Sequence, residues 1–186
     1  GKGENSLEGK TGIPVYSLYG KTRKPTEEML RPIDALVYDI QDNGCRSYTF
    51  ISTLGMIMEA AAEFDKEVIV LDRPNPLGGE KVEGSLVEDG FISFVSQFKI
   101  PYMYGLTVGE LALLLNGERM LKDGKQCKLT VVKMEGWRRS MTYQDTKLPW
   151  ILPSPQQPQA ISSLFYPTTG ILGELGYVSI GVGYTL

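Results

Sequence analysis

The sequence predicts an α/β fold: a Rossmann-like, mainly parallel sheet that is flanked by helices. Two nearly continuous apolar stretches, Ala35–Ile40 and Glu67–Asp72, are typical of parallel strands that are covered on both faces. Between them, residues 47–63 place apolar side chains at helical spacing. Strand, helix and strand in this order predict a right-handed βαβ unit.

The elements before this unit are expected to be short. Ile13–Leu18 predicts a strand, and Pro25–Leu30 predicts a helix that Thr26 caps at its N-terminus. Glu27 and Glu28 lie in its first turn, where carboxylates interact favourably with the helix dipole.

The helix predicted over residues 47–63 has one apolar face. The side chains on that face are Phe50, Leu54, Ile57 and Ala61. A second long helix is predicted over Thr107–Met120, because Thr107 and Glu110 form a T-x-x-E capping box. Cys127–Met134 alternates in polarity and predicts a further strand.

The last part of the chain carries prolines at positions 149, 153, 155 and 158, too many for a regular element. We therefore expect a Rossmann-like domain over residues 1–150, followed by a proline-rich connection and the start of a smaller C-terminal domain over residues 151–186. The final "SIGVGYTL" is expected to begin a strand. Because the chain starts in a glycine-rich loop pattern without methionine, we expect it to be part of a longer protein.

The composition excludes several classes of function. A net charge of −3 and a pI near 5.1 argue against a nucleic-acid-binding surface. The chain has no histidine, which excludes a Ser-His-Asp triad and a histidine metal site within it. No apolar run reaches the roughly 18–20 residues of a membrane-spanning helix. Cys45 and Cys127 fit either a disulfide or two buried thiols, of which buried thiols are the commoner arrangement.

No cofactor is predicted. The "GKG" at residues 1–3 follows no strand and lacks the third glycine of a dinucleotide fingerprint. A P-loop and a G-x-S-x-G nucleophile elbow are absent from the sequence.

Polar side chains follow the first strand of the βαβ unit, in the stretch "DIQDNGCRSYTF". They are Asp39, Gln41, Asp42, Arg46 and Tyr48. Ligands of parallel sheets bind beyond the carboxyl ends of the strands, so a site is expected at this position. In the structural alternative, Asp42 or Asn43 caps the following helix and Arg46 pairs with an aspartate.

The next strand ends in "DRPNPLGG". Arg73 and Asn75 offer planar hydrogen-bond donors that suit a carboxylate or a sugar acetamide. If the two strands are parallel neighbours, Asp72 and Arg73 converge with the first polar cluster. Alternatively, Asp72 anchors the loop backbone, which Pro74 and Pro76 stiffen.

Other candidates are scattered along the loops. Glu83 is either a site carboxylate or an exposed residue, and Ser154 lies in a rigid proline loop where a ligand contact is possible. Trp137 and Trp150 are either sugar-stacking platforms or parts of the core or a lid.

Six stretches, in the same order over nearly the whole chain, resemble one family. They are "VYSLYGKTRKPTEEML", "LVYDIQDNGCRSYTFISTL", "VLDRPNPLGG", "VEGS", "GLTVGELA" and "PWILPSPQQP". The chain is identified by them as similar to the NamZ-type bacterial exo-β-N-acetylmuramidases.

The resemblance implies a glycosidase that releases N-acetylmuramic acid from the non-reducing end of peptidoglycan fragments. It implies a peptidoglycan-derived saccharide as partner, no nucleotide cofactor, and a secreted or periplasmic location. The implied catalytic carboxylates are Asp42, Asp72 and Glu83. The implied substrate contacts are Asp39, Gln41, Arg46, Tyr48, Arg73, Asn75 and Ser154.

The sugar subsite is expected around Asp42 and Asp72, with Arg46 or Arg73 on the lactyl carboxylate of muramic acid. The resemblance also implies a preceding segment with a Gly-Pro-Glu-His-Gly stretch, whose glutamate is a candidate acid, so this chain alone is expected to be inactive. Tyr104 stands where relatives commonly have histidine. Near the end of the chain, Tyr177 and Val182 stand where relatives commonly have asparagine and arginine, which leaves the exact sugar open. The alternatives are a non-catalytic domain that binds peptidoglycan fragments or amino sugars, and a glycosidase for another amino sugar.

Overall fold

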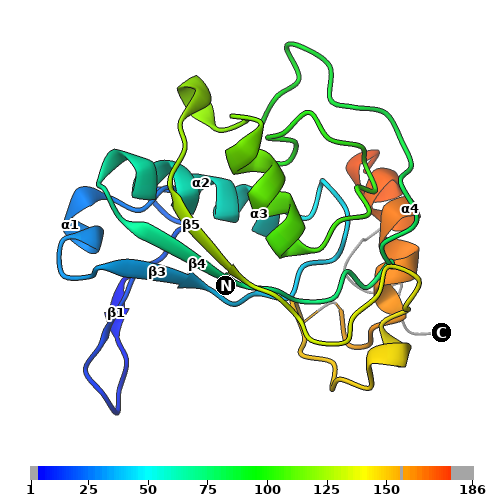
Figure 1. The fold of residues 1–186 in the computed structure, drawn as a ribbon, viewed down its shortest axis with the longest axis horizontal. Helices are drawn as coiled ribbons and strands as arrows, with labels where there is room; N and C mark the ends of the chain where they lie inside the picture. The colour runs from blue at the N-terminus through cyan, green and yellow to red at the C-terminus, as the bar shows by residue number, and fades with distance from the viewer. Residues whose placement is uncertain (1–3, 156, 177–186) are drawn as a thin grey trace.

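Three parallel strands and two crossover helices make up the centre of the chain (Figure 1). The computed structural model describes residues 4–155 and 157–176. The strands, in their order across the sheet, are β3 (Ala35–Tyr38), β4 (Glu67–Leu71) and β5 (Lys128–Val132). The connecting helices are α2 (Phe50–Glu63) and α3 (Val108–Gly117). The predicted βαβ unit is confirmed, and a second one follows it.

The apolar core lies between the sheet and these two helices, which Figure 1 shows together on one face of the sheet. Leu54 and Ala61 lie on the buried face of α2, as predicted, but Met58 rather than Ile57 is fully buried beside them. The fully buried members from the sheet and α3 are Tyr38, Val68, Val70, Leu111, Ala112 and Leu115.

The opposite face of the sheet is open at two strands. Val37 of β3 is 62% exposed and Val132 of β5 is 50% exposed. The expectation that Ala35–Ile40 is covered on both faces is therefore wrong. The physical reason is that α2 and α3 pack on the same face and that β3 lies at the edge of the sheet formed by the described residues.

The N-terminal part forms a small hairpin and a short helix. β1 (Ser6–Leu7) pairs antiparallel with β2 (Pro14–Val15), so the predicted strand at Ile13–Leu18 is shorter and belongs to a separate sheet. In α1 (Glu27–Leu30), Thr26 Oγ1 accepts the backbone N–H of Met29 and caps the helix as predicted.

The ends of the long helices differ from the prediction by three residues. α2 begins at Phe50 rather than Ser47, because Tyr48 N–H donates to the carbonyl of Cys45 and closes a turn first. α3 ends at Gly117 rather than Met120, since Arg119 adopts a left-handed φ of 54°. Both hydrogen bonds of the predicted capping box between Thr107 and Glu110 are present.

The C-terminal part contains a helix that the sequence analysis does not predict. α4 (Ser162–Glu174) follows the proline-rich stretch and holds Pro167 in its interior. Two short 3₁₀ helices, η1 (Lys122–Gly124) and η2 (Gln144–Thr146), precede it. The "SIGVGYTL" stretch lies outside the described residues, and the boundary at residue 150 stays a prediction.

Within residues 4–155 and 157–176, no helix is long and apolar enough to cross a membrane. The two thiols are free: Cys45 is buried and Cys127 is half-buried.

Candidate active site

The carboxyl ends of β3 and β4 bring two predicted clusters together. The strands are parallel neighbours in register, so the segments that follow them leave the sheet side by side. Arg73 Nε donates to Asp39 Oδ1 at 2.7 Å, and Arg73 Nη2 lies 2.6 Å from the same oxygen. The predicted convergence of the two strand ends is thereby confirmed.

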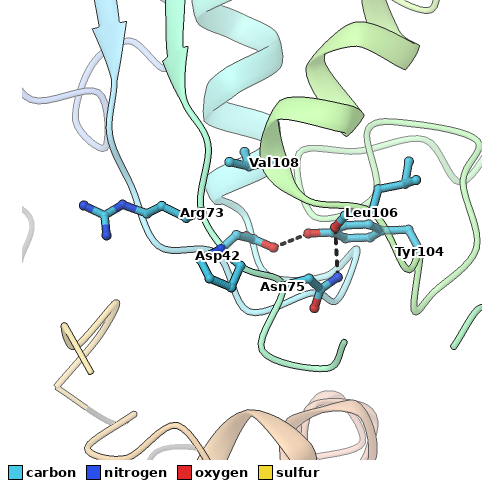
Figure 2. A pocket seen from close by; sticks show the side chains of 7 residues that line it. Asp42, Arg73, Asn75, Tyr104, Leu106 and Val108 are labelled. Carbon is cyan, nitrogen blue, oxygen red and sulfur yellow. Dashed lines mark hydrogen bonds between the residues drawn. The ribbon is translucent and has the colours of Figure 1, made fainter. Parts of the chain in front are cut away.

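Asp42 lies in a small buried cavity at this edge of the sheet (Figure 2). Its Oδ2 accepts hydrogen bonds from the Tyr104 hydroxyl and, at 2.8 Å, from the backbone N–H of Gly44. Its Oδ1 is buried and has no hydrogen-bond partner among the described residues. A buried carboxyl oxygen without a donor is costly, and such groups gather at functional sites.

Burial raises the pKa of Asp42 to about 6, although the hydrogen bonds from Tyr104 and Gly44 act in the opposite direction. Burial also raises the pKa of Tyr104 well above its ordinary value, so the phenol stays protonated and donates. Asp42 therefore gains and loses its proton near neutral pH, which is the property that a proton-transferring carboxyl needs.

The cavity around Asp42 is very small. Its volume is about 10 Å³, the room of one water-sized molecule. Figure 2 shows Asp42, Asn75 and Tyr104 close together, with the Arg73 side chain extending away from them. Nothing larger than a water-sized molecule fits inside, and Arg73 belongs to the cavity wall.

Asn75 fixes the loop after β4 against the segment that leads into α3. Its amide donates to the Leu106 carbonyl at 2.9 Å and accepts the Leu77 N–H at 2.9 Å. The loop passes so close to Gly44 that a Cβ there would lie 2.3 Å from Asn75 Oδ1. Both ends of the Asn75 amide are thus engaged within the protein.

Comparison with known proteins identifies the family. Residues 1–161 match the family described as "Exo-beta-N-acetylmuramidase NamZ, N-terminal". The chain belongs to the NamZ family. A curated relative from Bacillus subtilis (strain 168), the "Peptidoglycan beta-N-acetylmuramidase NamZ", is 50% identical over 179 residues. This match covers 96% of the chain and 42% of the relative.

Two solved structures from Bacteroides fragilis NCTC 9343 have the same fold as this NamZ-family chain. Both are described as DUF1343 family proteins. One is 69% identical with a TM-score of 0.91 and covers 97% of the chain; the other is 35% identical with a TM-score of 0.79 and covers 91%. The chain spans 46% and 45% of these proteins, so it corresponds to slightly less than half of each relative.

Asp72 accepts hydrogen bonds from the start of α3 in this NamZ-family chain. Its Oδ1 accepts the N–H groups of Gly109 (2.8 Å) and Arg73 (3.0 Å), and its Oδ2 accepts the Thr107 hydroxyl (2.9 Å). Burial raises the pKa of Asp72, and these hydrogen bonds oppose the rise. The alternative that Asp72 anchors backbone is confirmed, while its catalytic role stays a prediction.

Arg46 is engaged with backbone carbonyls rather than with an aspartate. Its Nη1 donates to the carbonyls of Ile100 (2.5 Å) and Ser85 (2.8 Å), and its Nε donates to Ser96 Oγ (3.3 Å). Burial lowers the pKa of Arg46. The arrangement fixes the loop over residues 85–100, whereas the Arg73 guanidinium pairs with the exposed Asp39 carboxylate.

Helix capping does not explain Asp42. α2 begins after Thr49, which makes no side-chain capping bond. Gln41 is also buried, and its amide donates to the carbonyls of Asp42 (2.8 Å) and Pro74 (3.0 Å). Gln41 therefore links the segments that follow β3 and β4 through hydrogen bonds.

Tyr48 and Ser154 lie together beside α4. The Tyr48 ring packs edge-on against Phe50, with centroids 4.9 Å apart, and against Tyr166 of α4 at 5.4 Å. Burial raises the pKa of Tyr48, and a hydrogen bond with Ser154 opposes the rise.

Glu83 lies in a different cavity from Asp42. Its backbone pairs with Met103, and its exposed side chain lines a cavity of about 310 Å³ together with Ile171 and Leu172 of α4. The structure thus groups Asp42 with Asn75 and Arg73, and does not place Glu83 with them.

Tyr104 is the site residue that sequence reasoning missed. It follows Asp42 by 62 positions and reaches it from the loop before α3. Tyr104 could have been found from its position three residues before the Thr107 capping box. The start of a crossover helix lies at the edge of the sheet where the strands end, so residues just before it lie near the site. The described residues contain no group of three or more acidic or cysteine side chains that could hold a metal ion.

Proposed function

We propose that the protein to which this chain belongs releases N-acetylmuramic acid from the non-reducing end of peptidoglycan fragments. The observation that carries the proposal is a buried carboxyl that titrates near neutral pH, in a chain 50% identical to a relative named as a peptidoglycan β-N-acetylmuramidase. This substrate lies outside the cytoplasmic membrane, so the proposed location is secreted or periplasmic.

Asp42 is the proposed proton-transferring carboxyl. A glycosidase needs one carboxylic acid that protonates the leaving oxygen and one carboxylate as nucleophile or base. Asp42 meets the pKa requirement, whereas Asp72 is engaged in holding α3 and Glu83 lines another cavity. The cavity has room only for a water-sized molecule, so access of a glycosidic oxygen to Asp42 requires part of the cavity wall to move.

Arg73 is the proposed anchor for the lactyl carboxylate of muramic acid. Its side chain is 30% exposed at the rim of the Asp42 cavity, and its present partner Asp39 is 47% exposed. An exposed ion pair contributes little to stability, so a substrate carboxylate can compete for the guanidinium. A bidentate contact of this kind selects muramic acid over N-acetylglucosamine.

The test uses the full-length protein with a chromogenic β-N-acetylmuramide and the matching β-N-acetylglucosaminide. Release from the muramide is expected, and Arg73→Lys is expected to lower kcat/KM for it by about ten- to a hundredfold through the loss of bidentate binding. Any weak glucosaminide release should stay unchanged. Arg46→Lys is the matched control and should lower thermal stability instead. Equal losses on both sugars would contradict the role of Arg73.

Binding without turnover is the second candidate function, because the Asp42 cavity has room only for a water-sized molecule. It predicts tight association of the full-length protein with muropeptides and no release from either glycoside.

A further inference from the structure

Two asparagines of the chain, Asn43 and Asn116, are directly followed by glycine. In such a pair the backbone nitrogen of the glycine can attack the side-chain carbonyl carbon of the asparagine, because glycine has no side chain that hinders the approach. The attack closes a five-membered succinimide ring and releases ammonia. In a folded protein the reaction depends on how the asparagine amide and the glycine N–H are held.

The structure holds the Asn116 amide firmly in place. Asn116 Nδ2 donates to the Cys127 carbonyl at 3.1 Å, and Asn116 Oδ1 accepts the Cys127 N–H at 2.9 Å. Gly117 is the last residue of α3, where a backbone N–H donates to the carbonyl four residues earlier. The amide that would be attacked and the nitrogen that would attack are therefore both engaged.

The Asn43 amide has no such contacts. Asn43 is fully buried, and neither its Nδ2 nor its Oδ1 has a hydrogen-bond partner among the described residues. Buried polar groups without partners are uncommon, and a catalytic role is one of their explanations. No hydrogen bond within the described part of the chain opposes rotation of this amide toward the Gly44 nitrogen.

Asp42 lies at the nitrogen that would attack Asn43. The Gly44 N–H donates to Asp42 Oδ2 at 2.8 Å, so a proton acceptor is within hydrogen-bond distance of the nucleophile. Burial raises the pKa of Asp42 to about 6, which makes its carboxylate a stronger base than that of an exposed aspartate.

The fold also requires the glycine of this pair. Gly44 has a left-handed φ of 84°, and a Cβ at this position would lie 2.3 Å from Asn75 Oδ1. A larger residue, which would slow the attack on Asn43, is therefore not tolerated without a shift of the loop after β4.

We propose that Asn43 is a site of spontaneous deamidation and that Asp42 transfers the proton for it. The Asp42 carboxylate takes the proton of the Gly44 nitrogen, and this nitrogen forms a bond to the side-chain carbonyl carbon of Asn43. The bond from that carbon to Nδ2 breaks, and Nδ2 leaves as ammonia with the proton that Asp42 returns. Solvent water then opens the succinimide at either carbonyl, which gives aspartate or isoaspartate at position 43.

The product carries a second buried carboxyl next to Asp42. Neighbouring carboxylates disfavour each other's ionisation, so the modification is expected to disturb proton transfer by Asp42. A resulting loss of glycoside release rests on the proposed function. The deamidation itself involves no substrate, and its test is therefore independent of that function.

The test incubates the full-length protein at neutral pH and follows both Asn-Gly peptides by mass spectrometry, with fragment spectra that locate each mass gain. Asn43 is expected to deamidate about a hundredfold faster than Asn116 in the folded protein. In concentrated urea, where the contacts are absent, the two rates should be similar. Asp42→Ser can still accept the Gly44 N–H but has no basic group, and it is expected to slow Asn43 by about a hundredfold.

Tyr104→Phe is the matched control for Asp42→Ser, because it removes another hydrogen bond of the same Asp42 oxygen and keeps the carboxylate. It should leave Asn43 reactive, and thermal unfolding verifies that both variants are folded. Equal rates at Asn43 and Asn116 in the folded protein, or an intact Asn43, overturn the modification site. An unchanged or faster reaction in Asp42→Ser, or an equal loss in Tyr104→Phe, overturns the role of Asp42.

Discussion

Asp42 makes the folded chain bind a proton more tightly than the unfolded chain does. Its pKa is about 6 when folded, against an ordinary value of 3.8. The stabilising effect of the protonated carboxyl is complete below pH 3.8 and is lost as the pH rises through 6. Above that pH Asp42 is a buried carboxylate whose Oδ1 has no hydrogen-bond partner among the described residues. Such a group lowers the stability of the fold, and functional sites commonly retain destabilising groups.

Asp42→Asn is therefore expected to stabilise the protein at pH 7.5, by up to about 3 kcal/mol, and to leave stability unchanged at pH 3.5. The amide keeps the shape of the side chain and never ionises. Thermal unfolding at the two pH values measures the difference, with the exposed Asp34→Asn as control. An equal effect of Asp42→Asn at both pH values would contradict this account, and the variant should lose glycoside release.

Tyr104→Phe is expected to raise the pKa of Asp42 further, because the phenol hydrogen bond is one of the contacts that hold this pKa down. The Asp42 carboxyl resonance, followed by ¹³C NMR against pH, measures the shift directly. Tyr38→Phe is the matched control, since Tyr38 is buried as deeply but donates to the Phe50 carbonyl. An unchanged titration in Tyr104→Phe would show that the phenol does not govern Asp42.

The sequence predicts the position of a single residue well where that residue directly follows a strand. Asp39, Asp42 and Arg73 come after strands that pair in parallel, and parallel pairing alone brings them to one edge. Tyr104 could not be predicted in this way, because a contact across 62 positions depends on the path of the intervening loop. The burial of Arg46 could not be predicted either, because it depends on the carbonyls that the loop over residues 85–100 presents to its guanidinium.

At the scale of the elements, α3 approaches the sheet so closely that one position must be glycine. A Cβ on Gly109 would lie 2.6 Å from Val131 Cγ1 and 2.8 Å from Asp72 Cγ. Gly109→Ala is expected to destabilise the protein by about 1–3 kcal/mol, because it separates the helix start from Asp72. Chemical denaturation measures the effect.

Gly117→Ala in the last turn of α3 is the matched control for Gly109→Ala, since nothing lies within 4 Å of the added carbon. It should be neutral or stabilise by less than about 1 kcal/mol, because alanine favours the helix. If both substitutions have the same effect, helix propensity explains it, and the close contact of Gly109 with Val131 and Asp72 does not.

The central elements are predictable because their signals are local and agree with one another. Apolar runs mark β3 and β4, and the Thr107–Glu110 capping box marks the start of α3. α4 was missed because Pro167 lies in its interior and prolines crowd the stretch before it, both of which argue against a helix. Its existence depends on packing, for example of Tyr166 against Tyr48, which no local pattern reveals.

At the scale of the whole molecule, Glu63 joins three segments that are distant in the sequence. Its carboxylate accepts from Lys24 Nζ at 2.8 Å and from Lys125 Nζ at 2.7 Å. Hydrogen bonds from Lys125 and Lys24 lower the pKa of Glu63 to about 2. Their contribution to stability is present above the ordinary pKa of 4.5 and is lost as the pH falls toward 2.

Glu63→Gln is expected to lower the free energy of unfolding at pH 7 by about 1 kcal/mol, because the pairs lie near the surface. The loss should shrink at high salt and vanish near pH 2. Urea denaturation at low and high salt measures it, with the exposed Glu80→Gln as control. A loss that is the same near pH 2 and pH 7 would mean that packing rather than charge explains the effect.

The strand order β3-β4-β5 has a kinetic consequence. Among the described residues, β4 pairs with β3 and β5 pairs with β4, so these three strands can join in the order in which they are synthesised. Ala35 pairs with Glu67, and Glu67 with Lys128, so the second loop closure spans nearly twice as many residues as the first. Doubling a loop adds only about 0.6 kcal/mol of closure entropy. β3 and β4 are thus expected to pair first. β5 is then expected to pair with the free edge of β4, and the longer loop adds only a small entropy loss to this second step.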